Sequence, residues 1–128
     1  MRTLLISSSG YDPYRVQFTN RDFATQHPDL VTKFVRASMR GWQAYLADPT
    51  ATNAELLKVN PALNPAQEAY STQALRDGGF VTGTDAAYPQ TGRMTAARWE
   101  ASYEQLKTLG ILHGPVDVST TYSLKFVP

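Results

Sequence analysis

The pattern between Pro28 and Pro49 constrains the fold of this chain more than any other feature. Apolar residues recur there at spacings of three or four, the period of one face of an α-helix. They are Leu30, Phe34, Trp42 and Tyr45, with Val31, Val35, Met39 and Leu46 widening the same face. The opposite side carries Lys33, Arg36, Arg40 and Gln43. The sequence therefore predicts a long helix with one face buried in the protein and the other in water.

The residues at both ends of this pattern set the bounds of the helix. Pro28 fits the first helical position, where no N–H donor is needed, and Asp29 favours the positive end of the helix dipole. Asp48-Pro49 ends the helix, because a proline disfavours helical backbone in the residue before it. We predict helix from about residue 28 to residue 47.

Two further helices are predicted in quick succession. Thr50 or Thr52 can cap a helix that continues to Val59. The next helix begins at Asn64-Pro65, where the asparagine side chain can accept a hydrogen bond from the first turn. Gly78-Gly79 ends it.

The last third of the chain contains a loop, a helix and a tail. Residues 80–94 are rich in Thr, Gly and Asp and are predicted to form a surface loop. Thr95 can cap the final helix, and Gly110 can end it by adopting a left-handed conformation. Both tryptophans, Trp42 and Trp99, lie on apolar helix faces, which favours packing in the core over stacking on a ligand.

The best strand candidates are Leu4-Leu5-Ile6 and Arg15-Val16-Gln17-Phe18. Two short strands do not make a stable sheet alone, so they need neighbours. We predict a single α+β domain over residues 1–128, mostly helical, with one or two N-terminal strands and four main helices. Its parts are the strands in 1–19, the helical segment 20–79, the loop 80–94, and the helix and tail 95–128.

Composition argues against several classes of function. A net charge of +1 on 128 residues provides no field to attract nucleic acid. The chain has no cysteine, and His27 and His113 are far apart, so neither a disulfide nor a zinc site is expected. We see no run of apolar residues long enough to cross a bilayer and no signal peptide.

Catalytic patterns are also missing. The serines beside Gly10 do not form the Gly-x-Ser-x-Gly elbow of hydrolases. Glu100 and Glu104 lie one helical turn apart, where with Lys107 they suggest a solvated charge pattern rather than an acid and base pair. We therefore predict no enzyme activity, no cofactor and no metal.

Several motifs together resemble one protein family, the substrate-binding proteins of ABC importers for nitrate, sulfonates, taurine and thiamine precursors. The similar motifs are Asn20-Arg21-Asp22-Phe23, His27-Pro28-Asp29-Leu30-Val31, Phe34-Val35-Arg36-Ala37-Ser38, Arg40-Gly41-Trp42 and Gly92-Arg93-Met94-Thr95-Ala96-Ala97-Arg98-Trp99. Members of that family have two lobes around a cleft and are more than twice as long. The resemblance implies that this chain corresponds to the C-terminal part, half of a lobe with the strands that cross between lobes.

The resemblance also implies a function and a site. The parent protein would be periplasmic or extracytoplasmic, would capture a small anion or a heterocyclic metabolite, and would deliver it to an ABC permease. The segment that crosses between lobes contains Ser7, Ser8, Ser9, Tyr11 and Tyr14, which are candidates for the substrate site. The same residues are also explained as a turn rich in hydroxyl groups.

A second interpretation concerns the chain by itself. It would be a free-standing helical interaction module derived from such a protein, without a role in transport. In either case its strands and wide apolar helix faces lack cover, which predicts that the isolated chain forms a homo-oligomer.

Overall fold

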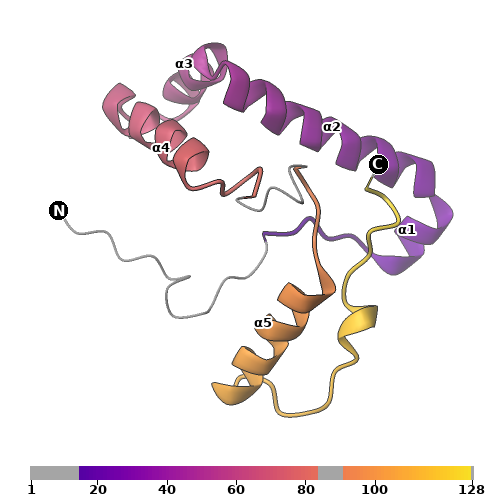
Figure 1. Ribbon diagram of the computed structural model, residues 1–128. Helices are drawn as coiled ribbons and strands as arrows, with labels where there is room; N and C mark the ends of the chain where they lie inside the picture. Colours follow the sequence, from indigo (N-terminus) through magenta and orange to yellow (C-terminus); the bar gives the residue numbers. More distant parts are fainter. Residues whose placement is uncertain (1–14, 84–90, 128) are drawn as a thin grey trace. The chain divides into compact units, whose positions relative to one another are not determined.

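A computed structural model describes residues 15–83 and 91–127 of the chain. Most of these residues are helical (Figure 1). The elements are α1 (Arg21–Gln26), α2 (Pro28–Ala47), α3 (Thr50–Val59), α4 (Pro65–Asp77), α5 (Ala96–Thr108) and the short 3-10 helix η2 (Val118–Thr120). The four main helices predicted from the sequence are confirmed, and α2 has the predicted bounds.

The caps explain why the helices begin where they do. The Asn64 side chain accepts a 2.8 Å hydrogen bond from the Gln67 N–H at the start of α4, as predicted. The Thr95 hydroxyl accepts a 3.3 Å bond from the Arg98 N–H at the start of α5, also as predicted. The cap predicted for α3 was wrong, because Thr50 is the first residue of this helix and its N–H donates to the Asp48 carboxylate at 3.0 Å.

The predicted strands are not confirmed. Residues 15–18 form neither helix nor strand, although they are described. A strand requires a hydrogen-bonded neighbour, and the described residues supply none. The other candidate, Leu4-Leu5-Ile6, lies outside the described residues.

The chain divides into two compact units. Unit 1 comprises Met1–Gln26 and Met94–Lys125, and unit 2 comprises His27–Arg93 and Phe126–Pro128. Unit 1 thus contains α1, α5 and η2, whereas unit 2 contains α2, α3 and α4. The prediction of one domain over residues 1–128 stays a prediction.

In unit 2 the wide apolar face of α2 is only partly covered. Val31, Val35, Met39 and Leu46 are half-buried, whereas Leu30 and Phe34 remain 55% and 60% exposed. Trp42 is 44% exposed and touches Tyr45 edge to face, with ring centroids 5.9 Å apart. The prediction that Trp42 is buried was therefore wrong, because the pattern identifies an apolar face without identifying what covers it.

The end of the predicted surface loop packs against α2 within unit 2. Thr91 is buried, with 5% of its surface exposed. At Gly92 the backbone has φ +85, and a β-carbon there would lie 3.1 Å from the Met39 side chain. Glycine therefore allows the chain to turn close to α2, and Thr91 is buried at this turn whereas Gly92 and Arg93 are exposed.

Candidate functional site

The five candidate site residues, Ser7, Ser8, Ser9, Tyr11 and Tyr14, lie outside the described residues. Their role remains a prediction. We therefore looked for polar and aromatic groups that the described helices bring together.

The most concentrated polar group links all three helices of unit 2. The Tyr45 hydroxyl of α2 lies 3.0 Å from Asn53 Oδ1 of α3 and 2.9 Å from Thr72 Oγ1 of α4. Asn53 Nδ2 completes a triangle by donating to Thr72 Oγ1 at 3.3 Å. Asn53 therefore accepts a hydrogen bond from Tyr45 and donates one to Thr72, while the Tyr45 and Thr72 hydroxyl oxygens lie within hydrogen-bond distance of each other.

Burial assigns this triangle a structural role. Thr72 is only 4% exposed, and its hydroxyl also lies 2.9 Å from the Glu68 carbonyl one turn earlier. A ligand would have to displace α3 or α4 to reach it. The triangle therefore orients helices instead of offering donors to a solute. It could not be predicted from the sequence, because its residues are up to 27 positions apart.

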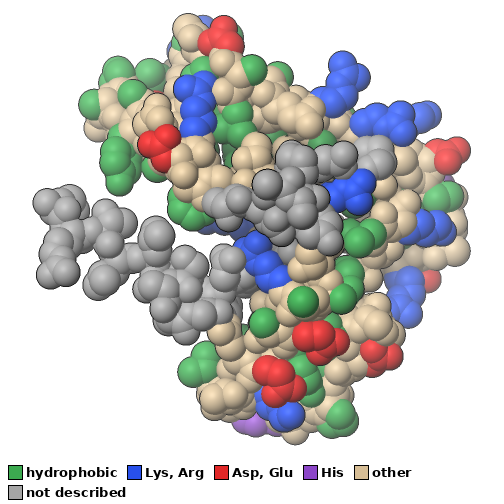
Figure 2. Space-filling model, viewed as in Figure 1, with side chains coloured by type: hydrophobic (Ala, Val, Ile, Leu, Met, Phe, Trp, Pro, Cys, Tyr) green, Lys and Arg blue, Asp and Glu red, His purple; other side chains and the backbone are tan. Residues whose placement is uncertain are grey.

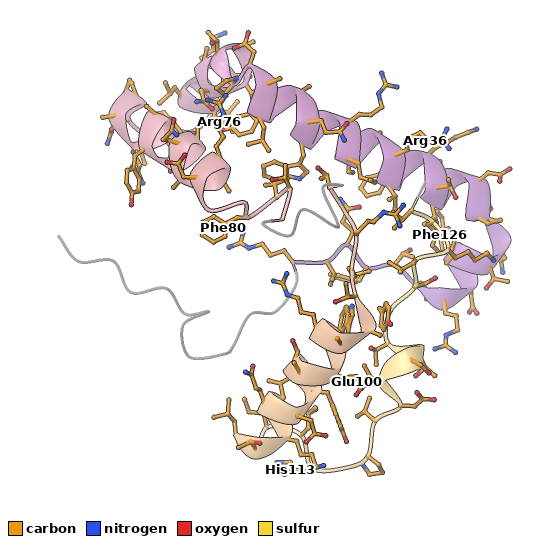
Figure 3. All side chains as sticks on the ribbon, viewed as in Figure 1. Arg36, Arg76, Phe80, Glu100, His113 and Phe126 are labelled. Atoms are coloured by element: carbon orange, nitrogen blue, oxygen red, sulfur yellow. The ribbon has the colours of Figure 1, made fainter. Side chains whose placement is uncertain are left out.

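A second contact in unit 2 involves Arg76 at the end of α4. Its Nε and Nη2 donate to the Leu46 carbonyl at 2.9 and 2.6 Å, so the side chain reaches the end of α2 (Figure 3). The last carbonyls of a helix lack intrahelical partners and carry partial negative charge. Arg76 satisfies one of them and is thereby committed to holding α4 on α2.

Unit 1 contains an aromatic contact. The rings of Trp99 on α5 and Tyr122 after η2 are parallel within 5°, with centroids 5.1 Å apart. They touch each other, which leaves no space for a third ring between them. Among the described residues of this unit, Val118 of η2 is the apolar one that is buried, at 6% exposure. The prediction that Trp99 packs within the protein is confirmed, whereas its partner Tyr122 was not predicted.

The exposed charges show no catalytic arrangement. Glu104 pairs with Lys107 at 3.6 Å on the surface of α5, so the predicted solvated pattern is confirmed there. Lys and Arg side chains are spread along α2 (Figure 2), where Arg36 points away from the helix (Figure 3). Among the described residues no group of three His, Asp or Glu residues could hold a metal ion. No helix in that part of the chain is both long and apolar enough to span a membrane.

The similarity of the chain to known proteins indicates a family, which the geometry of the described residues does not. Residues 9–52 match the model of the NMT1/THI5-like family. Over 104 residues the chain is 32% identical to the riboflavin-binding protein RibY of Chloroflexus aurantiacus. These matches relate the chain to the NMT1/THI5-like family. The alignment covers 80% of this chain and 30% of RibY, so the chain spans about a third of that protein.

The family match has a defined position on the fold. It includes α1 and α2 together with three of the five candidate site residues, Ser9, Tyr11 and Tyr14. The resemblance inferred from the sequence motifs of α1 and α2 is therefore confirmed as a relationship to substrate-binding proteins of this family. No solved structure matches the chain.

Proposed function

We propose that the chain forms part of an extracytoplasmic solute-binding protein that captures a heterocyclic metabolite and delivers it to an ABC permease. The observation that supports this proposal is the 32% identity with a riboflavin-binding protein over 80% of the chain. Of the two ligand classes that the sequence suggested, the relative favours the heterocycle over the small anion. The protein binds its ligand without chemical conversion.

The proposed site lies in the segment that precedes α1. Tyr11 and Tyr14 would supply rings that cover a flat heterocycle, and the hydroxyl groups of Ser7, Ser8 and Ser9 would donate hydrogen bonds to its polar edge. A cleft of this kind closes over its ligand as two lobes approach each other. The Tyr45–Asn53–Thr72 triangle would keep the helices of one lobe in place during closure.

A chimera with RibY tests this proposal. The RibY segment that aligns with this chain is replaced by the whole 128-residue chain, and riboflavin binding is measured by quenching of flavin fluorescence. We expect the chimera to bind riboflavin within about tenfold of RibY, since both segments would supply equivalent walls of the cleft. A chimera that is folded by circular dichroism but does not bind riboflavin would contradict the proposal.

Substitutions in the chimera locate the site. Tyr11→Ala with Tyr14→Ala should weaken riboflavin binding at least tenfold, because the ring contacts are lost. Tyr70→Ala is the matched control, since Tyr70 is 69% exposed on α4 and lies outside the family match. If both changes weakened riboflavin binding equally, Tyr11 and Tyr14 would not be residues of the site.

The isolated chain should behave differently. A small solute needs convergent donors on both sides of a closed cleft, and this chain spans 30% of the relative. We expect no affinity of micromolar strength for taurine, alkanesulfonates, nitrate or thiamine-pathway pyrimidines. Calorimetric titration of the 128-residue chain measures this, and a micromolar constant for one of them would show that it forms a complete site for that solute.

The second interpretation, an interaction module without transport, has one observation in its favour. Leu30 and Phe34 leave an apolar stripe of α2 exposed, as a docking helix would. The chimera separates the two interpretations, because a module with no transport role has no reason to restore riboflavin binding.

A further inference from the structure

Residues 15–19 of unit 1 form an exposed segment without hydrogen bonds to other described residues. All five are exposed, and Phe18 reaches 94% exposure while Val16 reaches 45%. None of the five makes a hydrogen bond, through backbone or side chain, within the described structure. The segment leads directly to α1, which begins at Arg21, so it is anchored at its C-terminal end.

The order of side chains in this segment is that of a strand with two unlike faces. Val16 and Phe18 alternate with Arg15, Gln17 and Thr19. In a strand, therefore, the two apolar side chains would share one face and the three polar ones the other. Valine and phenylalanine also favour strands.

The segment is complementary to itself about Gln17. If two copies run antiparallel with Gln17 opposite Gln17, Val16 of each copy faces Phe18 of the other. Arg15 then faces Thr19, so no two cations meet. A β-branched residue opposite an aromatic one is a favourable cross-strand pair, whereas like charges opposite each other are unfavourable.

Other pairings lose this match. A parallel pair in register would place Arg15 beside Arg15. Moving the antiparallel register by one residue would place Val16 opposite Gln17 and mix apolar with polar side chains on both faces. Of these pairings, the antiparallel register centred on Gln17 is thus the one that pairs all five residues, keeps the faces distinct and places no arginine opposite another.

We propose that two copies of this chain associate through residues 15–19 as a symmetric antiparallel strand pair with Gln17 on the twofold axis. This pairing satisfies backbone groups that are unpaired in one copy and joins Val16 and Phe18 of both copies into one apolar face. The inference concerns assembly and does not depend on the proposed function. Because a two-stranded ribbon is only marginally stable, the dimer should be concentration-dependent.

Light scattering over a dilution series tests the assembly. The mass should increase from 14.2 kDa toward twice that value as the concentration rises. Phe18→Lys should raise the dissociation constant at least tenfold, since it places a cation against Val16 of the other copy. Its exposure means that the variant should keep the helices, which circular dichroism checks. Phe34→Lys on α2 is the matched control, with 60% of its side chain exposed, and should leave the dimer intact.

Cysteine cross-linking tests the register. The chain has no cysteine, so a single introduced one reports one position. Gln17→Cys should form a disulfide-linked dimer under mild oxidation, because directly opposed β-carbons lie within roughly 4.5–5.5 Å. Thr19→Cys should cross-link at least tenfold more slowly, because its two copies would be about 14 Å apart along the ribbon.

Each of three results would overturn the proposal. The first is a monomer at all concentrations up to about a millimolar. The second is a dimer that Phe34→Lys dissociates and Phe18→Lys does not, which would assign the interface to α2. The third is equal cross-linking at positions 17 and 19, which would exclude the register centred on Gln17.

Discussion

The contacts inside unit 2 differ in chemistry from the contacts inside unit 1. In unit 2, hydrogen bonds from Tyr45, Asn53 and Thr72 and the Arg76 contact to α2 join three helices. In unit 1, the Trp99–Tyr122 stack and the buried Val118 hold α5 against η2. The helix with the clearest apolar pattern, α2, has no fully buried residue, whereas α4 buries Thr72 and Glu68. Strong apolar patterning and actual burial are thus separate properties of this chain.

The chain provides one reporter for each unit. Trp42 lies in unit 2 and Trp99 in unit 1, and there is no third tryptophan. Fluorescence of Trp42→Phe therefore follows unit 1 alone, and fluorescence of Trp99→Phe follows unit 2 alone. The comparison between the units can be tested with these two backgrounds in urea.

The largest effect is expected for Trp99→Ala. Loss of a stacked, half-buried indole should reduce the stability of unit 1 by about 3 kcal/mol. Urea unfolding followed by circular dichroism should show a weakened α5, while Trp42 fluorescence keeps the unit 2 midpoint. A parallel shift of that midpoint would mean that the two units unfold as one.

Thr72→Val comes next. Removal of the hydroxyl takes away the contacts of Thr72 with Tyr45 and Asn53 and leaves those two residues bonded to each other alone, which should cost unit 2 about 2 kcal/mol. Thr108→Val is the matched control, since its exposed hydroxyl makes the same bond to a carbonyl one turn earlier. We expect that control to cost less than about 0.5 kcal/mol. Thr72→Val is followed by Trp42 fluorescence and Thr108→Val by Trp99 fluorescence. Equal losses of stability would mean that the effect comes from the bond between the threonine hydroxyl and the carbonyl one turn earlier.

Local signals made most of the helices predictable. Pro28 and Asp48-Pro49 set the bounds of α2, and Asn64 and Thr95 form the caps expected of them. Each of these acts on residues within one helical turn, which a sequence displays directly. The cap of α3 was misjudged because two threonines and an aspartate compete there, and the aspartate accepts the bond.

Contacts between elements were not predictable from the sequence. Arg76 binds a carbonyl 30 residues away, and Trp99 stacks on a tyrosine in the tail. No period or spacing indicates such partners, since they depend on how helices approach each other. The candidate site residues before α1 lie outside the described residues, so their role in binding rests on the resemblance to substrate-binding proteins.

Gly92 in unit 2 and Gly110 in unit 1 both lie at turns, so the same substitution can be compared in the two units. Gly92 and Gly110 have φ of +85 and +68, so alanine should cost each unit about 1–2 kcal/mol of backbone strain. A β-carbon at Gly92 also meets Met39 at 3.1 Å, whereas none of the chain lies within 4 Å at Gly110. Gly92→Ala should therefore be the more harmful change in urea melts. The opposite order would show that Met39 moves aside freely.

Trp42→Ala tests the exposed face of α2. With 44% of its surface in water, Trp42 should contribute about 1 kcal/mol to unit 2, less than a buried tryptophan. Arg40→Ala, on the polar side of the same helix, should change stability by less than about 0.5 kcal/mol. Urea melts followed by circular dichroism compare them. A loss of about 3 kcal/mol or more for Trp42→Ala would mean that another surface covers it in solution.

The smallest effect is expected at Asp48, which connects α2 to α3 in unit 2. Hydrogen bonds from the Thr50 side chain and backbone N–H, with the charge of Arg76, hold the pKa of Asp48 below its usual value. A folded-state pKa below the unfolded one stabilises the protein above the unfolded pKa, and this contribution is lost as pH falls through the folded pKa. Part of the acid sensitivity of unit 2 below about pH 4 should therefore disappear in Asp48→Asn. Thr50→Ala should raise the pKa of Asp48 in an NMR titration, and Thr52→Ala should leave it unchanged. A rise with Thr52→Ala instead would mean that Thr52, and not Thr50, donates its hydroxyl to Asp48 in solution.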